Sequence, residues 1–71
     1  MKITAVEYFI AVADAGSIRA ASQKLYIAQP SLTKALQAME QELGVQLFTR
    51  TSSGIRLTVA GETILPQARQ M

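Results

Sequence analysis

A very short connection between two helical segments limits what this chain can fold into. Residues 17–25 and 29–43 both carry apolar side chains at helical spacing, and only Tyr26, Ile27 and Ala28 separate them. Because three residues leave room for nothing but a tight turn, the two helices must cross steeply. Two adjacent alanines in the first segment permit the close approach that such a crossing requires. The sequence therefore predicts two helices joined at a steep angle, with Ile27 packed beneath the turn.

The second of these segments, residues 29–43, has the clearest periodicity in the chain. Its apolar positions are Leu32, Leu36, Met39 and Leu43, at spacings of four, three and four residues. This spacing is typical of one face of an α-helix, and Gly44 is a suitable C-cap. The opposite face carries no acidic side chain over its first three turns. An N-terminus without acids suits an anionic partner, because the helix dipole is positive there.

A core helix is predicted before this unit, over residues 4–15, with Thr4 as its cap and Gly16 as its end. Its apolar stripe comprises Ile3, Val6, Phe9, Ile10 and Ala13. Tyr8 lies off the stripe and is expected at the surface. Ser17 is a good N-cap for the following helix. The inner side of that helix is expected to consist of Ile18, Ala21 and Leu25.

Two short strands, over residues 45–50 and 55–58, are predicted around the turn-forming run 51–54. A two-stranded hairpin of this size is not stable alone, so its apolar side must pack on the helices, as a wing does. Alternation along the second strand directs Arg56 outward.

Thr58 is expected to cap a fourth helix. Its narrow apolar stripe consists of Ala60, Ile64, Ala68 and Met71. Nothing left in the chain is expected to cover this stripe. Pro66 lacks a backbone N–H and predicts a kink in this helix.

Composition excludes several classes of protein. A chain of 71 residues, 49% of them hydrophobic, is one small domain. It has no cysteine and no histidine, which excludes disulfides, thiolate or imidazole metal sites and nucleophile-histidine catalysis. No Gly-rich phosphate loop is present, so neither an enzyme nor a cofactor is expected. No stretch reaches the roughly 18 apolar residues of a membrane span, so we expect a cytoplasmic protein without a membrane partner.

The distribution of charge is more informative than the net charge of +2. Every charged residue in the windows 15–39 and 43–61 is basic. These residues are Arg19, Lys24, Lys34, Arg50 and Arg56. Charge alone leaves two interpretations open, ordinary solvated side chains or a face that binds a polyanion.

Together the elements predict a mainly α fold. Residues 1–58 are expected to form a winged helix-turn-helix with a three-helix core and a short β-hairpin wing, and residues 59–71 the start of a C-terminal linker helix. The second helix of such a motif lies in the major groove of DNA.

Several short motifs follow one another along essentially the whole chain. They are Ala20-Ala21 through Leu25, Gln29-Pro30-Ser31-Leu32-Thr33, Met39-Glu40 to Glu42-Leu43-Gly44, Leu47-Phe48 with Arg50, and Leu57-Thr58 with Ala60-Gly61. In order and spacing they resemble the N-terminal domain of LysR-type transcriptional regulators. The resemblance implies a bacterial regulator that binds double-stranded DNA sequence-specifically. It also implies a larger C-terminal domain, absent from this chain, that binds a small-molecule effector.

The resemblance further implies a homodimer in which the linker helix pairs with its copy, and a higher oligomer for the full-length protein. The dimer residues would be Ala60, Ile64, Leu65, Ala68 and Met71. Such a dimer would bind an interrupted inverted repeat with half-sites about 34 to 36 Å apart, or a multiple of this.

Base contacts are expected from the start of the helix over residues 29–43. The candidates are Gln29, Pro30, Ser31, Thr33, Lys34 and Gln37. Gln29 can pair with adenine or remain a solvated first-turn side chain, and Lys34 can reach a phosphate or a guanine. Pro30 suits the first turn of a helix for structural reasons and can also touch a thymine methyl group. Gln37 is equally compatible with the groove edge and with plain surface.

Contacts to the DNA backbone are expected from two places. The candidates are Ser17, Ile18, Arg19, Arg50, Ser52, Ser53 and Arg56. The free N–H groups after Ser17, with Arg19 beside them, can bind a phosphate, although capping alone also explains Ser17. The wing residues can approach the backbone or minor groove, or simply keep an edge hairpin soluble.

Three positions depart from the family's usual pattern. Lys34 stands where arginine is common, and lysine acts as a point charge rather than a bidentate donor. Ala28 stands where serine is common, so the following helix lacks a side-chain cap. The wing tip is Ser52-Ser53 without a basic residue, which predicts a weak attraction to DNA. A protein-interaction module that uses the outer face of the helix over 29–43, or the last helix, is the second hypothesis.

Overall fold

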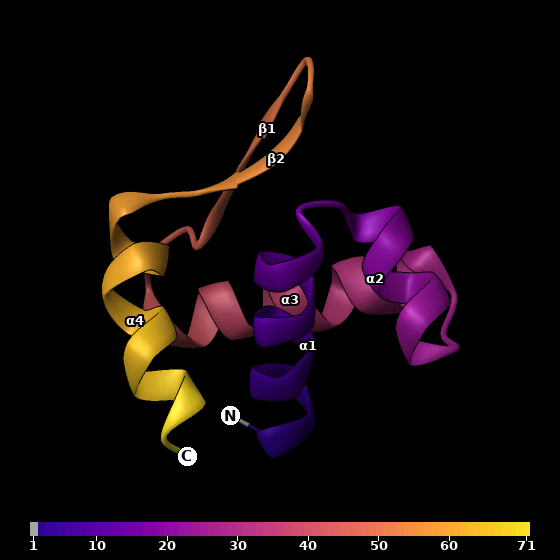
Figure 1. Ribbon diagram of the computed structural model, residues 1–71. Helices are drawn as coiled ribbons and strands as arrows, with labels where there is room; N and C mark the ends of the chain where they lie inside the picture. The colour runs from indigo at the N-terminus through magenta and orange to yellow at the C-terminus, as the bar shows by residue number, and fades with distance from the viewer. Residues whose placement is uncertain (1) are drawn as a thin grey trace.

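Four helices and one two-stranded sheet follow one another along residues 2–71, the part of the chain that the computed structural model describes. Their bounds are α1 Ile3–Ala15, α2 Ile18–Leu25, α3 Gln29–Leu43, β1 Phe48–Thr51, β2 Gly54–Leu57 and α4 Val59–Arg69. In Figure 1, α3 crosses behind α1, α2 and α4 lie on either side of α1, and the hairpin of β1 and β2 projects away from the helices. The predicted mainly α fold is confirmed. Within this part of the chain, no helix is long and apolar enough to cross a membrane.

Two hydroxyl side chains start helices, as the sequence predicts. The Ser17 Oγ accepts a hydrogen bond of 3.0 Å from the N–H of Ala20 and caps α2. The Thr58 Oγ1 accepts one of 3.0 Å from the N–H of Gly61 and caps α4. Each cap satisfies a backbone donor that a helix N-terminus leaves unpaired.

The other two helices begin without a side-chain cap. The cap predicted at Thr4 is wrong, because α1 begins one residue earlier, at Ile3, after an N-cap, Lys2, that makes no side-chain hydrogen bond to it. Ala28 precedes α3 and, as expected from its methyl side chain, provides no cap either. The N–H groups of the first turn of α3 therefore remain available to another acceptor.

The turn between α2 and α3 closes on a left-handed residue, Tyr26, with φ 59° and ψ 41°. This conformation costs an L-amino acid about 1–2 kcal/mol. The turn is held by the N–H of Ile27, which donates to the carbonyl of Ser22 at 3.0 Å. Ile27 is half-buried against the core, as predicted. The steep connection between α2 and α3 thus depends on the strained backbone of Tyr26 and on the half-buried side chain of Ile27.

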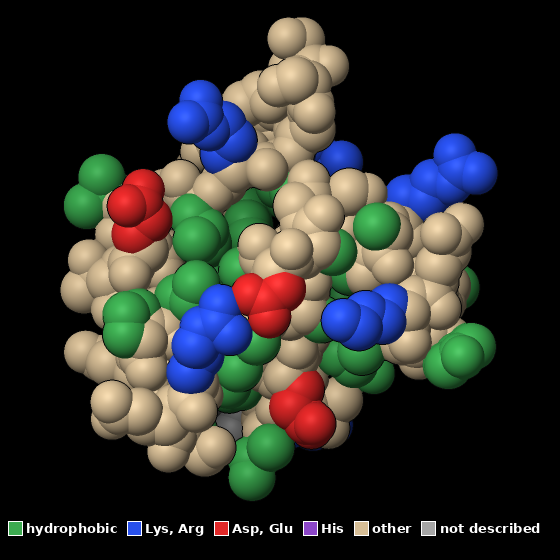
Figure 2. Space-filling view, in the orientation of Figure 1, with side chains coloured by type: hydrophobic (Ala, Val, Ile, Leu, Met, Phe, Trp, Pro, Cys, Tyr) green, Lys and Arg blue, Asp and Glu red, His purple; other side chains and the backbone are tan. Residues whose placement is uncertain are grey.

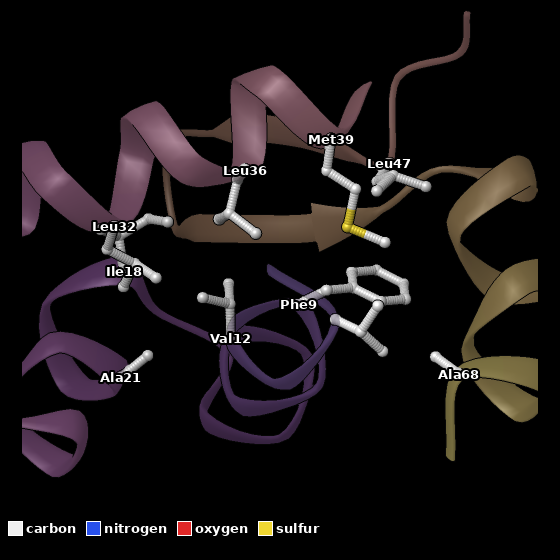
Figure 3. Close-up of a cluster of buried hydrophobic side chains, with 10 residues drawn as sticks. Phe9, Val12, Ile18, Ala21, Leu32, Leu36, Met39, Leu47 and Ala68 are labelled. Carbon is white, nitrogen blue, oxygen red and sulfur yellow. The ribbon is translucent and has the colours of Figure 1, made fainter. Parts of the chain in front are cut away.

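Side chains from α1, α2 and α3 form the core, together with Leu47 from the segment before β1 and Ala68 from α4 (Figure 3). The largest fully buried side chains are Phe9, Val12, Leu32 and Leu47. The ring of Phe9 meets that of Phe48 edge-on, with ring centroids 5.4 Å apart. Burial of a large apolar side chain stabilises a fold by about 1.5–3 kcal/mol. The base of the hairpin is therefore part of the core rather than an appendage to it.

The buried face of α1 differs from the predicted stripe. Val6, Phe9 and Val12 are buried, whereas Ile3 is 72% exposed. Tyr8, expected at the surface, is half-buried and packs against the core. The reason is that α1 packs against α2, α3 and α4 at once, so its covered face is wider than one stripe.

The strands β1 and β2 pair antiparallel, with Phe48 opposite Leu57. The strand β1 is shorter than the predicted stretch 45–50 and ends one residue later, whereas β2 is as long as the predicted stretch 55–58 but begins and ends one residue earlier. The strand β1 begins only at Phe48, because backbone groups of the residues before it form hydrogen bonds with Glu40 of α3 and with Thr58, the N-cap of α4, instead of with a neighbouring strand. Arg56 is exposed while its two neighbours in β2 are half-buried, so the predicted alternation is confirmed.

The apolar stripe of α4 is partly covered by α1, and the expectation of an uncovered stripe is wrong. Ala68 is 3% exposed and belongs to the core, and Ile64 and Leu65 are half-buried against it. The Nη2 of Arg69 lies 2.6 Å from the Oδ1 of Asp14, which fastens the last turn of α4 to the end of α1.

The start of α4 packs directly on the backbone before β1. The N–H of Thr58 donates to the carbonyl of Leu47 at 2.9 Å, and its hydroxyl donates to the carbonyl of Gln46 at 2.5 Å. Gly61 lies against the same segment. A Cβ atom at this position would overlap the carbonyl oxygen of Leu47 and lie 2.8 Å from the Cδ2 of Leu57. Only glycine fits here without a shift of the backbone.

We expect Gly61→Ala to destabilise the domain although alanine is the better helix former. Overpacking against the Leu47 carbonyl costs about 1–3 kcal/mol, against a propensity gain of at most about 1 kcal/mol. Urea unfolding measures the difference. Gln67→Ala, an exposed change in the same helix, is the control and should shift the free energy of unfolding by no more than about 0.5 kcal/mol. A Gly61→Ala variant as stable as the wild type would contradict the packing described.

The pair of Asp14 and Arg69 predicts a titration shift. A hydrogen bond from Arg69 is the main cause that holds the pKa of the Asp14 carboxyl below its ordinary value of 3.8; desolvation opposes it, and the positive charges of Arg69 and Lys24 add to the lowering. Arg69→Gln should therefore raise this pKa toward 3.8 in a carboxyl NMR titration, and Arg56→Gln should leave it unchanged. Because the folded-state pKa is the lower one, the stability from this pair is present above 3.8 and is lost as the pH falls through the folded-state value. An unchanged Asp14 pKa in Arg69→Gln would contradict the pairing.

Candidate nucleic-acid interface

The outward face of α3 carries most of the residues expected to read bases. Its core side is formed by Leu32, Leu36 and Met39, which are buried. The exposed predicted residues are Gln29, Pro30, Ser31, Lys34 and Gln37. Thr33 is half-buried and faces the wing rather than open solvent. The phase predicted for α3 is confirmed at Leu32, Leu36 and Met39, whereas Leu43, the last position of the predicted stripe, is 36% exposed. The first turn contains proline and no acidic residue.

A groove of about 330 Å³ lies between the starts of α2 and α3 and the hairpin. The predicted residues that it brings together are Ser17, Ile18, Arg19, Gln29, Arg50 and Ser52. Two guanidinium groups, from Arg19 and Arg50, thus border one groove from opposite elements. None of the described residues that line it is acidic. Positive side chains beside the free N–H groups of a helix start form a site suited to an anion such as a phosphate.

Thr51, Gly54 and Ile55 also line this groove and were missed by sequence reasoning. The first two appeared only as turn residues, yet they form the last pair of the ladder. Gly54 approaches the turn after α1, since a Cβ placed on it would lie 3.5 Å from the carbonyl oxygen of Gly16. No local spacing in the sequence indicates this approach of two distant segments.

Two predicted wing residues lie outside the groove. The hydroxyl of Ser53 is 3.3 Å from that of Thr51 at the hairpin tip, and Arg56 is exposed opposite Thr49. Both remain on the projecting part of the wing, where a second stretch of a long ligand can reach them. Ser53 and Arg56 therefore lie outside the groove, although Ser52 and Gly54 of the same hairpin turn line it.

Ser31 and Lys34 border another hollow, of about 430 Å³, between α3 and the first half of α1. Lys2 and Tyr8 line it from α1 and were not predicted as site residues. No spacing in the sequence relates residue 2 to residue 34, because only the crossing of α1 over α3 brings them together. The hollow thus has two ammonium groups, of Lys2 and Lys34, and the acidic Glu42 in its lining.

A narrow cleft of about 90 Å³ connects the face of α3 to the wing. Arg50 lines this cleft as well as the larger groove, so it stands between the two regions. Glu40 is the acidic residue in the cleft, and its Oε2 accepts hydrogen bonds from the N–H groups of Leu47 at 2.6 Å and Phe48 at 3.3 Å. Its negative charge is thus directed at backbone amides rather than at solvent.

Figure 2 shows basic side chains on the hairpin and over α2. The acidic side chains on this face lie over α1 and α4, together with a basic side chain between these two helices. Within residues 2–71, no three histidine, cysteine, aspartate or glutamate side chains gather closely enough to hold a metal ion. The chemistry offered by the groove is therefore hydrogen bonding and positive charge.

Two helices, α2 and α3, are joined at a steep angle, and α3 presents a polar outer face. A hairpin shares a groove with the starts of both helices. These features define a winged helix-turn-helix domain. Residues 3–62 match the family described as the bacterial regulatory helix-turn-helix protein, lysR family. The chain belongs to this family.

Individual relatives agree with this assignment. The HTH-type transcriptional regulator ClcR of Pseudomonas putida is 51% identical over 71 residues, which is 100% of this chain and 24% of ClcR. The regulator TfdT of Cupriavidus pinatubonensis is 46% identical over 71 residues, 100% of this chain and 31% of TfdT. The crystal structure of the CbnR DBD-DNA complex has a TM-score of 0.94 and 46% identity, covering 99% of this chain and 80% of that one. This chain thus spans less than a third of the length of ClcR and of TfdT.

Proposed function

We propose that this chain binds double-stranded DNA sequence-specifically, as the DNA-binding domain of a LysR-type transcriptional regulator, with α3 in the major groove. The observation that carries the proposal is the groove bordered by Arg19 and Arg50, which adjoins the start of α3 and contains no acidic side chain among its described residues. Phosphates held there would place the first turns of α3 against base edges. The similarity to the CbnR DBD, which is in complex with DNA, supports DNA binding.

Roles within α3 follow from exposure and chemistry. Gln29 and Lys34 are exposed near the N-terminal end, where a recognition helix meets base edges, and we assign them to adenine and to guanine or phosphate, respectively. Ser31, Thr33 and Gln37 provide shorter polar contacts. Pro30 starts the helix, and the uncapped first turn leaves N–H groups for a phosphate.

We further propose that two copies associate through α4 on an interrupted inverted repeat. Ala68 cannot contribute a major contact, since it is buried against α1. Exposed apolar side chains remain at Val59, which is 82% exposed, and at Met71, which is 78% exposed. Ala60, Ile64 and Leu65 are partly accessible between them. These residues form a seam along α4 that a second copy would cover.

The domain itself is proposed to act by binding alone, in the cytoplasm, without a cofactor or catalytic step. The chain has no histidine or cysteine to serve as nucleophile or base. Response to a small-molecule effector is assigned to a C-terminal domain of the longer regulator, consistent with the share of ClcR and TfdT that this chain matches.

Selection of bound sequences from a random duplex pool tests the proposed function. We expect enrichment of a motif, arranged as two inverted half-sites whose centres lie about 34 to 36 Å apart or a multiple of this distance. Enrichment of a single half-site would support DNA binding and contradict the dimer. A pool that enriches no motif would overturn the proposal and favour a protein-interaction module.

Lys34→Ala should weaken binding to the selected duplex by about 1–3 kcal/mol if Lys34 reads a base, and relax the preference at that base pair. Fluorescence anisotropy titrations with matched and mutated duplexes measure both effects. Gln41→Ala is the control, because Gln41 is exposed two turns further along the same face, beyond the expected groove contact. Equal affinities for wild type and Lys34→Ala would remove Lys34 from the interface.

A further inference from the structure

One residue of α3, Glu40, binds nearly every backbone N–H in the connection between α3 and the wing. Its carbonyl accepts from the N–H of Gly44 at 2.8 Å and of Val45 at 3.3 Å, which ends the helix. Its carboxylate accepts from the N–H of Leu47 at 2.6 Å and of Phe48 at 3.3 Å. The connection is thus shaped around a single side chain of the recognition helix.

These hydrogen bonds fix the point at which the wing begins. Leu47 is fully buried, and Phe48 is the first residue of β1. Side chains two residues apart in a strand point to the same face, so the placement of Phe48 sets the direction of Arg50. Glu40, Phe48 and Arg50 accordingly line the same 90 Å³ cleft.

The hydrogen bonds of Glu40 also keep its carboxylate away from Arg50. A carboxylate that formed an ion pair with a DNA-binding arginine would prevent the arginine from binding a phosphate. Here the carboxylate of Glu40 binds two amides, and the guanidinium of Arg50 forms no ion pair with any other residue between 2 and 71. Hydrogen bonds between a carboxylate and backbone N–H groups are about twice as strong as neutral ones, so this choice of partners is stable.

We propose that Glu40 is a positioning residue for DNA binding, which sets the wing so that Arg50 meets a phosphate beside the groove read by α3. The inference rests on the proposed function. Glu40 itself does not touch DNA in this proposal, and it acts through the segment of Leu47 and Phe48.

The direction of the change in DNA affinity on Glu40→Gln distinguishes a positioning role of Glu40 from a purely electrostatic effect of its charge. Removing a negative charge near a polyanion site strengthens binding by electrostatics alone. Glu40→Gln keeps the shape of the side chain but weakens its hold on the two amides, so the proposal predicts weaker binding. The two explanations therefore predict changes of opposite direction.

The experiment measures the dissociation constant of the 71-residue chain for the selected duplex over a range of salt concentrations. Variants are Glu40→Gln, Arg50→Ala and the double variant, with Glu7→Gln as the control that removes the same charge from an exposed position on α1. Arg50→Ala should reduce the slope of log K against log salt by about 0.9, the contribution of one phosphate. Glu40→Gln should weaken binding about three- to tenfold, reduce the slope in the same direction, and add nothing in the Arg50→Ala background. Glu7→Gln should bind as tightly as the wild type or more tightly.

Binding by Glu40→Gln as tight as the wild type, or an equal loss in both backgrounds, would overturn the inference while leaving the proposed function intact. If the wild type bound no duplex, the proposed function would fail first and this inference with it. Amide hydrogen exchange checks the state of the variant. Faster exchange at Leu47 and Phe48 with unchanged protection in α1 and α3 shows that the variant is folded and that only the wing is released. Should Glu40→Gln unfold, Glu40→Asp, which keeps the charge but shortens the reach to the amides, must show the same dependence on Arg50 for the inference to stand.

Discussion

Leu47 is the residue on which the positions of α3, the wing and α4 all depend. Its N–H donates to the Glu40 carboxylate, its carbonyl accepts from Thr58 and lies against Gly61, and its side chain is fully buried. A polar group in such a place is costly unless it is satisfied, and here both its donor and its acceptor are. The wing therefore cannot move relative to α3 without breaking these bonds, and a short hairpin, unstable alone, acquires a fixed position beside the groove.

The parts of the fold that local chemistry determines could be predicted from the sequence. The bounds of α3, the caps at Ser17 and Thr58, the end at Gly44 and the outward direction of Arg56 depend on residues within a few positions of one another. Apart from local errors such as the cap at Thr4, the wrong expectations concern packing between distant segments. Ala68 is covered because α4 folds back on α1, and Tyr8 lies beside α3, which α1 crosses; nothing in the spacing of these helices indicates that they meet.

The same distinction applies to the candidate site. Helix phase identified the exposed residues of α3, and charge identified Arg19 and Arg50, but their meeting across one groove required the wing to be placed. In the sequence Glu40 is part of a family motif and an acid near the end of a helix, and neither observation connects it with the strand that follows. Its role depends on the direction the chain takes after Gly44, and backbone direction has no signature in side-chain spacing.

The three-residue connection between α2 and α3 has a consequence for the order in which the domain folds. Helices α1, α2 and α3 follow one another closely, so their contacts close only short loops at a small cost in chain entropy. The pairing of Asp14 with Arg69, in contrast, joins residues 55 positions apart. The helical unit can thus assemble early as a local nucleus, and the docking of α4, which also closes the Leu47 junction, completes the domain last. The surface formed early is that of α3, and the final step of folding is the one that orients the wing.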